Sequence, residues 1–199
     1  QRVGIDRIAI MARKLGLGQR HDLPMSAVAE GIAPDREWKM ARHGQAWQIG
    51  DSLNASIGQG FVLASPLQLA VMTARLANGR KQLNPRLIKS VGGVEMPPGD
   101  EVPNLPFSQE HLDYVRAGMI AVANDPSGTA YRQSQLGLGD VLMAGKTGTA
   151  QVRSYDGVAN RDSRSVRWGL KDHNLYVAFA PIDQPRYAIS VIIQHGGLG

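Results

Sequence analysis

With 199 residues, of which 43% are hydrophobic and 20% are charged, the chain is long enough and apolar enough to enclose one hydrophobic core. Its 22 Lys and Arg residues exceed its 17 Asp and Glu residues, but they are dispersed and not interleaved with aromatic residues, so no nucleic-acid partner is expected. The lack of cysteine excludes disulfides and thiolate metal sites, and no stretch approaches the roughly 18 consecutive apolar residues of a membrane span.

The first part of the chain predicts two helices separated by an irregular segment. Apolar residues recur at helical spacing over Ile5 to Leu15 and are followed by glycine, which predicts the first helix. Residues 21–48 contain two prolines and no sustained period, which is typical of an irregular surface excursion. Ser65-Pro66 is an N-cap followed by proline at the first helical position, so a second helix is expected over Leu67 to Leu76, closed by Asn78-Gly79.

The middle of the chain predicts a peripheral strand or hairpin and then a third helix. Residues 80–107 hold five prolines around the short apolar piece Leu87 to Val91, a pattern typical of the edge of a fold. Ser108 is a suitable cap for a helix that ends at Asn124 to Gly128. The apolar stripe of that helix is expected to consist of Leu112, Val115, Met119 and Val122.

The last third predicts three strands, over Val141 to Val152, Leu175 to Pro181 and Tyr187 to Gln194. They are expected to be adjacent and antiparallel, with the last two joined by the hairpin-length link Ile182 to Arg186. The apolar richness of the last two strands favours central positions for them in a sheet covered on both faces. Helices first and strands afterwards predict a mixed α/β domain of the α+β kind, not a bundle or a doubly wound sheet.

The chemically most informative segment is Lys146-Thr147-Gly148-Thr149, on the first of these strands, which we expect to be accessible at its edge. Because side chains alternate along a strand, Lys146 and Gly148 share one face while Thr147 and Thr149 share the other. Two hydroxyls near an ammonium group are suited to holding a carboxylate, and free backbone groups are suited to pairing with an extended peptide. The alternative is a solvated strand lysine beside ordinary β-forming threonines.

Blocks around this strand are similar to one known family. Lys-Thr-Gly is the third signature of serine penicillin-binding proteins and β-lactamases. The matching blocks are KTGTAQV (Lys146 to Val152), SIGQGFVLASPLQLA (Ser56 to Ala70), DPSGTA (Asp125 to Ala130) and NLYVAFAPIDQPRYAISVIIQHGG (Asn174 to Gly197). On these blocks the chain is identified as a member of the penicillin-binding transpeptidase family, most similar to its elongation-type penicillin-binding protein 2 group. The resemblance covers nearly the whole chain.

The resemblance implies the penicillin-binding and serine β-lactamase-like fold, in which terminal antiparallel strands are covered by helices. It implies an enzyme that cross-links peptidoglycan stem peptides by serine acyl-enzyme transfer, without a cofactor, at the periplasmic face of the bacterial inner membrane. The implied partners are stem peptides ending in D-alanyl-D-alanine, β-lactams and membrane proteins of the elongation machinery. The membrane anchor is expected outside this sequence.

The resemblance also implies roles for individual residues. Lys146, Thr147, Gly148 and Thr149 form the catalytic set, and Thr147, Thr149 and Gln151 form the substrate-binding set. Lys146 would polarise the site and assist proton transfer, while Thr147 and Thr149 would bind the terminal carboxylate. The backbone N–H of Thr149 would supply half of an oxyanion hole. Gln59 and Gly60 would lie in a supporting loop behind the site, or in a simple turn.

The sequence departs from the family pattern at the nucleophile. No Ser or Thr has a lysine three positions later, so the Ser-x-x-Lys pair is absent from these 199 residues. Ser52-Leu53-Asn54 spells the second signature, but it directly precedes the SIGQG block, whereas the family's motif lies upstream of a stretch like Gly4 to Arg7. We therefore interpret Ser52 as a decoy. We expect residues 1–199 to be the C-terminal portion of one transpeptidase domain, which begins after the second motif and stops before the closing helix.

Three alternatives stay open at this point. In the same fold, the chain fits a division-type transpeptidase or a β-lactamase. In another class, it fits a non-catalytic module that keeps the carboxylate-binding strand and binds peptidoglycan stems. Reading the sequence upstream for Ser-x-x-Lys would decide between a cut enzyme and such a module.

Two further groups of residues have weaker interpretations. His21, Asp22, His43 and His173 lack the ligand spacing of a catalytic zinc site, so we expect solvated histidines and no metal. The segment Val152 to His173 exceeds hairpin length, which favours a functional flap or a mobile insertion beside the groove. Within it, Trp168 is suited either to contact glycan or a partner protein or to pack on its own loop. The cations of this segment are Arg153, Arg161, Arg164, Arg167 and Lys171.

Overall fold

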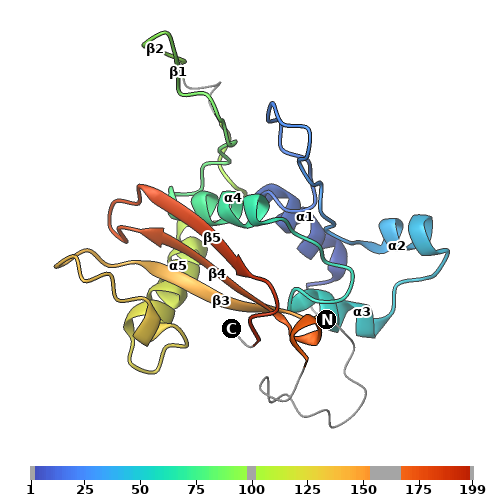
Figure 1. The fold of residues 1–199 in the computed structure, drawn as a ribbon. Coiled ribbons are helices and arrows are strands. Elements are labelled where there is room, and N and C mark those ends of the chain that lie inside the picture. The colour runs from blue at the N-terminus through green and yellow to red at the C-terminus, as the bar shows by residue number, and fades with distance from the viewer. Residues whose placement is uncertain (1–2, 98–101, 153–166, 198–199) are drawn as a thin grey trace. The chain divides into compact units, whose positions relative to one another are not determined.

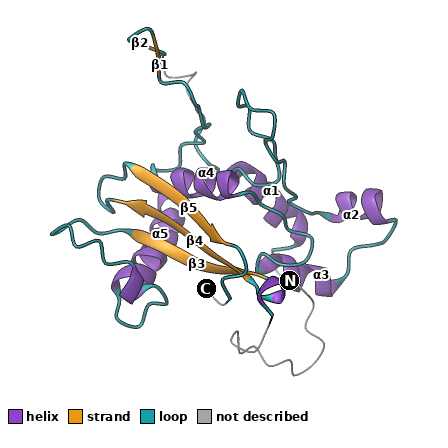
Figure 2. Ribbon diagram, viewed as in Figure 1, coloured by secondary structure: helices purple, strands orange, loops and turns teal. Residues whose placement is uncertain are grey.

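The computed structural model describes residues 3–97, 102–152 and 167–197. The chain falls into two compact units, unit 1 over Gln1–Gln109 and unit 2 over Glu110–Gly199. In the described residues, unit 1 contains four α-helices and a short hairpin, and unit 2 contains one α-helix, two 3-10 helices and an antiparallel sheet (Figures 1 and 2). Among the described residues, no helix combines the length and hydrophobicity needed to cross a membrane.

Unit 1 confirms the two helices that the sequence predicts. Helix α1 spans Ile5–Leu15, and its C-cap is Gly16 in the left-handed conformation. Helix α4 spans Pro66–Ala77, and its C-cap is Asn78. The Ser65 hydroxyl accepts from the backbone N–H of Gln68 at 3.2 Å, and the Gln68 amide oxygen accepts from the backbone N–H of Ser65 at 3.1 Å. This reciprocal pair is a capping box, which explains why the Ser-Pro signal marks the start of α4.

The prediction of an irregular excursion over residues 21–48 is wrong in part. Helix α2 spans Arg36–His43, and helix α3 spans Ile49–Ser56 directly after the segment. Both are eight residues long, too short to show a repeated apolar period. Lys39 of α2 is 4% exposed and forms an ion pair with the Asp51 carboxylate of α3. Hydrogen bonds from the Lys39 side chain and the Gln48 backbone lower the pKa of Asp51.

The peripheral strand or hairpin that the sequence predicts is a short hairpin. Strand β1 spans Ser90–Val91 and pairs antiparallel with β2, Val94–Glu95, so the apolar residues from Leu87 onwards lie mostly outside a strand. Within unit 1 this hairpin lies at the end of an extended arm, away from the helices (Figure 1). All four of its strand residues are exposed, as its peripheral position requires.

Helices α1 and α4 of unit 1 are linked by the buried cation Arg75 of α4, whose side chain is 1% exposed. Its guanidinium donates to the backbone oxygen of Lys14 at 2.7 Å, to the backbone oxygen of Leu83 at 2.9 Å and to Oδ1 of Asn84 at 3.1 Å. Burial lowers the pKa of this guanidinium. Arg75 therefore ties α4 to the end of α1 and to the chain that leaves α4.

Unit 2 confirms the predicted antiparallel sheet. Strands β3 (Ala144–Ala150), β4 (His173–Ala180) and β5 (Tyr187–Ile193) lie side by side in the order β3-β4-β5 (Figure 2). Lys146 is opposite Val177, and Tyr176 is opposite both Thr147 and Val191. Helix α5 spans Gln109–Asn124, and the 3-10 helices η1 (Tyr131–Gln133) and η2 (Trp168–Leu170) lie in the connections.

Helix α5 packs on the sheet face that carries Phe179. The Arg116 guanidinium of α5 lies 5.4 Å from the centre of the Phe179 ring. The buried residues of α5 include Leu112 and Met119 of the predicted stripe. Val115 is 46% exposed and Val122 is only half-buried, so the prediction is wrong at these two positions. The buried face is completed by the small residue Ala123, which the apolar-stripe argument does not select.

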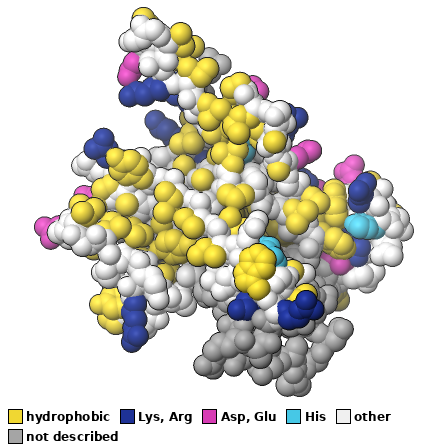
Figure 3. Space-filling view, in the orientation of Figure 1, with side chains coloured by type: hydrophobic (Ala, Val, Ile, Leu, Met, Phe, Trp, Pro, Cys, Tyr) yellow, Lys and Arg dark blue, Asp and Glu magenta, His cyan; other side chains and the backbone are white. Residues whose placement is uncertain are grey.

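The prediction of central positions does not hold for β5. In the part of the chain that the structure describes, β5 pairs with β4 alone and is an edge strand. Ile189, Val191 and Ile193 of β5 are 44% to 58% exposed. Hydrophobic side chains gather over the strands on the face seen in Figure 3. The apolar side chains of β5 are therefore not buried by the part of the chain that the structure describes.

The proposed flap between Val152 and His173 falls mostly on residues 153–166, which lie outside the described residues, as do Arg153, Arg161 and Arg164. The described end of the segment contains Trp168, which is 66% exposed and whose ring centre lies 4.6 Å from that of His195.

Replacing Arg75 by leucine is expected to lower the free energy of unfolding of unit 1 by about 2–3 kcal/mol, because three acceptors lose their donor at once. Urea denaturation followed by tryptophan fluorescence measures the change, since Trp38 and Trp47 belong to this unit. The matched control is Arg42→Leu at an exposed position of α2, which should change it by less than about 0.5 kcal/mol. Equal losses for the two variants would contradict the role given to Arg75.

Candidate functional site

The Lys-Thr-Gly-Thr segment lies on an edge strand, as its sequence predicts. Among the described residues β3 pairs only with β4, so alternate backbone N–H and C=O groups of β3 point away from the sheet. Lys146 is exposed, and its ammonium group donates to the backbone oxygen of Thr147 at 2.9 Å. The strand therefore combines an open hydrogen-bonding edge with a cation that solvent can reach.

The two faces of β3 differ as alternation requires. A Cβ atom built on Gly145 would overlap the hydroxyl of Tyr176, whereas one built on Gly148 would meet Leu175. Gly145 thus lies on the face of Thr147, Thr149 and Tyr176, and Gly148 lies on the face of Lys146. The structure brings Thr147 and Thr149 to one face, with Thr149 opposite Asn174 of β4.

Tyr176 of β4 lies on the threonine face and links it to the segment after η1. Its hydroxyl lies 2.7 Å from the Ser134 hydroxyl, which follows η1, and 3.7 Å from the Met143 sulfur. Ser134 is 4% exposed, so this hydrogen bond is shielded from water. The side chain of Tyr176 fills the space that Gly145 leaves empty, and this contact places the start of β3 on β4.

Thr129 is a site residue that the sequence reasoning did not single out. Its hydroxyl oxygen lies 3.1 Å from the hydroxyl oxygen of Thr147. Thr129 belongs to the DPSGTA block, whose position in the sequence gave no signal of this contact because 18 residues separate the two threonines. A hollow of about 360 Å³ opens beside the pair, and it lies entirely within unit 2. Its lining includes Thr129, Ser134, Thr147, Asn174 and Tyr176.

Gln151 lies just beyond the end of β3 and is exposed. The next residue, Val152, donates its backbone N–H to the Asp172 carboxylate at 3.1 Å, which holds together the ends of β3 and β4. The neighbouring His173 accepts from the backbone N–H of His195 at 3.0 Å through Nδ1. These contacts place Gln151 at the end of the threonine-bearing strand.

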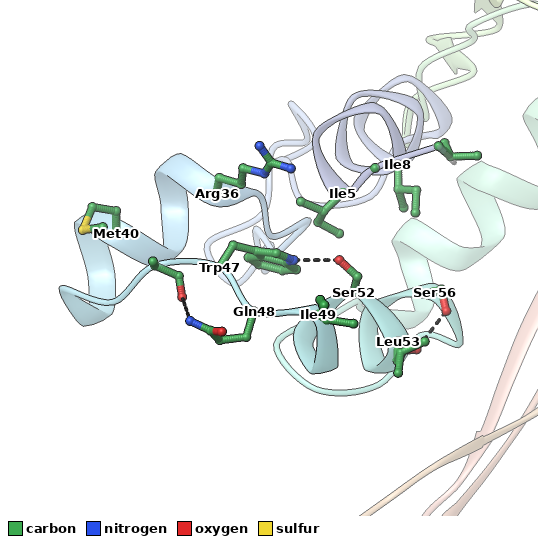
Figure 4. A pocket seen from close by; sticks show the side chains of 13 residues that line it. Ile5, Ile8, Arg36, Met40, Trp47, Gln48, Ile49, Ser52, Leu53 and Ser56 are labelled. Carbon is green, nitrogen blue, oxygen red and sulfur yellow. Dashed lines mark hydrogen bonds between the residues drawn. The ribbon is translucent and has the colours of Figure 1, made fainter. Parts of the chain in front are cut away.

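In unit 1, the Ser52 hydroxyl is held by a structural contact. The indole N–H of Trp47 donates to Ser52 Oγ at 2.8 Å, as the close view of the surrounding hollow shows (Figure 4). This hollow has a volume of about 870 Å³, and many of its lining residues are apolar. The interpretation of Ser52 as a decoy stays a prediction.

Gln59 and Gly60 form a compact turn after α3. The backbone N–H of Gln59 donates to the backbone oxygen of Asn54 at 2.9 Å. Gly60 has a φ of 71°, and a Cβ atom there would lie 3.1 Å from the Asn54 Cβ. Glycine therefore suits this position both by conformation and by space.

The expectation of solvated histidines is wrong for His21. His21 is 4% exposed, and its Nε2 lies 3.0 Å from the backbone oxygen of Gly16. Burial lowers its pKa, and the positive charge of Arg75 adds to that effect against the opposing hydrogen bond. Within the described part of the chain, no group of three or more potential metal ligands comes together.

Replacing Gly145 by alanine should displace Tyr176 from Ser134, because the new methyl group would overlap the phenol hydroxyl. We expect the local free energy of opening of β3 and β4 to fall by about 1–3 kcal/mol, measured by amide hydrogen exchange. The matched control is Gly148→Ala, whose nearest neighbour is the Leu175 Cβ at 3.3 Å and which should cost less. Indistinguishable protection of the strands in the two variants would rule out this packing argument.

Comparisons with known sequences converge on one kind of protein. The family model described as penicillin binding protein transpeptidase domain matches residues 1–199. Peptidoglycan D,D-transpeptidase MrdA of Acinetobacter baumannii is 34% identical over 201 residues, which is 99% of this chain and 29% of that protein. MrdA of Salmonella typhimurium is 31% identical over 200 residues, which is 98% of this chain and 32% of that protein. The chain thus spans about a third of the length of these curated relatives.

The chain is also similar in structure to solved penicillin-binding proteins. Pseudomonas aeruginosa PBP2, in complex with WCK 5153, aligns with a TM-score of 0.81 and 36% identity over 100% of this chain and 41% of that chain. PBP2 of Helicobacter pylori, in complex with MreC, aligns with a TM-score of 0.80 and 31% identity over 98% of this chain and 33% of that chain.

Proposed function

Because this chain belongs to the penicillin-binding protein transpeptidase domain family, we propose that it supplies the substrate-binding strand of an elongation-type peptidoglycan D,D-transpeptidase. The observation that carries the proposal is the edge strand β3, with Thr147 and Thr149 on one face and an exposed Lys146 on the other. We assign Lys146, Thr147, Gly148 and Thr149 to catalysis and Thr147, Thr149 and Gln151 to substrate binding.

The substrate is the extended stem peptide ending in D-alanyl-D-alanine. Its backbone pairs with the open edge of β3, as a peptide does when it adds a strand to a sheet. The terminal carboxylate accepts hydrogen bonds from the hydroxyls of Thr147 and Thr149, while the ammonium group of Lys146 supplies the opposite charge. A β-lactam presents its carboxylate to the same groups.

The reaction is acyl transfer in two steps. A serine hydroxyl in the longer protein attacks the carbonyl of the penultimate D-alanine and loses its proton to a neighbouring base, which passes it to the nitrogen of the terminal D-alanine as that residue leaves as an amine. The amino group of a second stem peptide then attacks the acyl-enzyme ester and gives up a proton, which the base returns to the serine oxygen as the ester bond breaks. The backbone N–H of Thr149 donates to the oxyanion of each tetrahedral intermediate, where the loss of one donor typically costs roughly 100- to 1,000-fold in rate.

The longer protein would work at the periplasmic face of the bacterial inner membrane, where its peptidoglycan substrate lies. Two similarities support an elongation-type assignment. MrdA is the name of the curated relatives reported above, and the Helicobacter pylori PBP2 structure is a complex with MreC. We therefore include a membrane protein of the elongation machinery among the partners, together with stem peptides and β-lactams.

Replacing Lys146 by alanine in the longer protein should lower the rate of acylation by a fluorescent penicillin at least about tenfold. The reason is that a charge-assisted hydrogen bond in a partly desolvated groove is worth roughly 1.5–3 kcal/mol. The labelled band on a denaturing gel, followed over time, gives the rate. The melting temperature should change little, because Lys146 is exposed and its ammonium group donates to the backbone oxygen of the adjacent Thr147.

Two controls accompany this variant. Lys89→Ala makes the same substitution at a lysine side chain that is 78% exposed on the hairpin of unit 1. Ser52→Ala tests the decoy serine. Both should leave acylation within about threefold of the parent rate. If Ser52→Ala abolished acylation while Lys146→Ala did not, the assignment of the site to β3 would be wrong.

A further inference from the structure

We infer that Thr129 is a positioning residue, which donates its hydroxyl proton to Thr147 and thereby aims the Thr147 hydroxyl at the substrate carboxylate. This inference rests on the proposed function, in which Thr147 binds that carboxylate. Its starting point is the distance of 3.1 Å between the two hydroxyl oxygens, both of which lie in unit 2.

The turn that carries Thr129 is rigidly built. The Asp125 carboxylate accepts from the backbone N–H of Ser127 at 2.8 Å and from the Ser127 hydroxyl at 2.6 Å, and these hydrogen bonds lower the pKa of Asp125. The backbone N–H of Gly128 donates to the backbone oxygen of Asp125 at 2.8 Å. A Cβ atom on Gly128 would overlap the backbone oxygens at the end of α5, so only glycine fits there.

The residue after Thr129 is fixed as well. The backbone N–H of Ala130 donates to the backbone oxygen of Val122 at 3.1 Å, and Ala130 is 4% exposed. Thr129 therefore sits between two anchored residues, while its own side chain remains exposed beside β3. An exposed side chain on an anchored turn contributes little to the core, so its contact with Thr147 needs another explanation.

The direction of the hydrogen bond follows from counting protons. A carboxylate only accepts hydrogen bonds, so Thr147 must give its single hydroxyl proton to the substrate. When it does so, its oxygen can interact with Thr129 only as an acceptor, and Thr129 must be the donor. Donation to the Thr147 oxygen also polarises its O–H bond and strengthens the bond to the carboxylate.

The same contact selects the side-chain rotamer of Thr147. Threonine carries a hydroxyl and a methyl group on Cβ, and rotation about χ1 exchanges their positions. The hydrogen bond from Thr129 favours the rotamer in which the oxygen faces the turn and the hollow beside it. Without it, the methyl group competes for that position, and fewer molecules present the hydroxyl to the substrate.

The test uses the longer, nucleophile-bearing enzyme and two probes, benzylpenicillin and its methyl ester, which lacks the free carboxylate. Thr129→Val removes the donor at nearly constant volume and should slow acylation by benzylpenicillin about three- to tenfold. Thr129→Ser restores the donor and should stay within about twofold of the parent. Acylation by the methyl ester should be the same in all three proteins, a result that a merely structural role would not produce.

Thr147→Val distinguishes the carboxylate-binding role of Thr147 from the positioning role of Thr129. It should slow acylation by benzylpenicillin at least about tenfold, and adding Thr129→Val to it should cause no further loss. If Thr147→Val has no effect, the carboxylate-binding role of Thr147 in the proposed function fails. If Thr147→Val is damaging but Thr129→Val has no effect, slows both probes equally or is not rescued by serine, only the role of Thr129 is overturned. Thr129→Ala replaces Thr129→Val if the latter does not fold.

Discussion

The arrangement of unit 2 depends on one requirement, which is that strand β3 is held by a single neighbouring strand in the described residues. Strand β3 must pair with β4 to be held in place, yet it must keep its other edge open for a peptide to pair with it. An unsupported edge would be prone to slip in register, which would exchange the faces of Lys146 and Thr147. The surrounding contacts can be understood as the means by which the chain fixes β3 from the side of β4 and from its own ends.

Those contacts come from several elements. At the start of β3, the Asn124 amide at the end of α5 donates to the Met143 oxygen at 2.8 Å, and Tyr176 fills the space over Gly145. At its end, the Asp172 carboxylate accepts from the backbone N–H of Val152. The side of β3 that faces away from β4 takes part in no strand pairing within the described residues. Support is therefore concentrated where it does not obstruct the open edge.

Local signals in the sequence predicted those parts of the fold that depend on local chemistry. Helices α1 and α4 carry both an apolar period and capping residues, and the three strands carry apolar runs, so these elements were predictable. The family resemblance and the α+β class are likewise confirmed. The apolar period does not predict helices α2 and α3, because each is only eight residues long and too short to show that period twice.

The site shows the same division. The strand motif and its alternation could be predicted from adjacent residues, whereas the contact of Thr129 with Thr147 depends on how a turn folds back onto the strand.

The central claim is that the face of β3 that carries Thr147 and Thr149 binds the substrate carboxylate. A crystal structure of the longer enzyme acylated by benzylpenicillin tests it most directly. The account predicts the ligand carboxylate at hydrogen-bonding distance, about 2.6–3.2 Å, from the hydroxyls of Thr147 and Thr149. A carboxylate held elsewhere, with both hydroxyls unengaged, would contradict it.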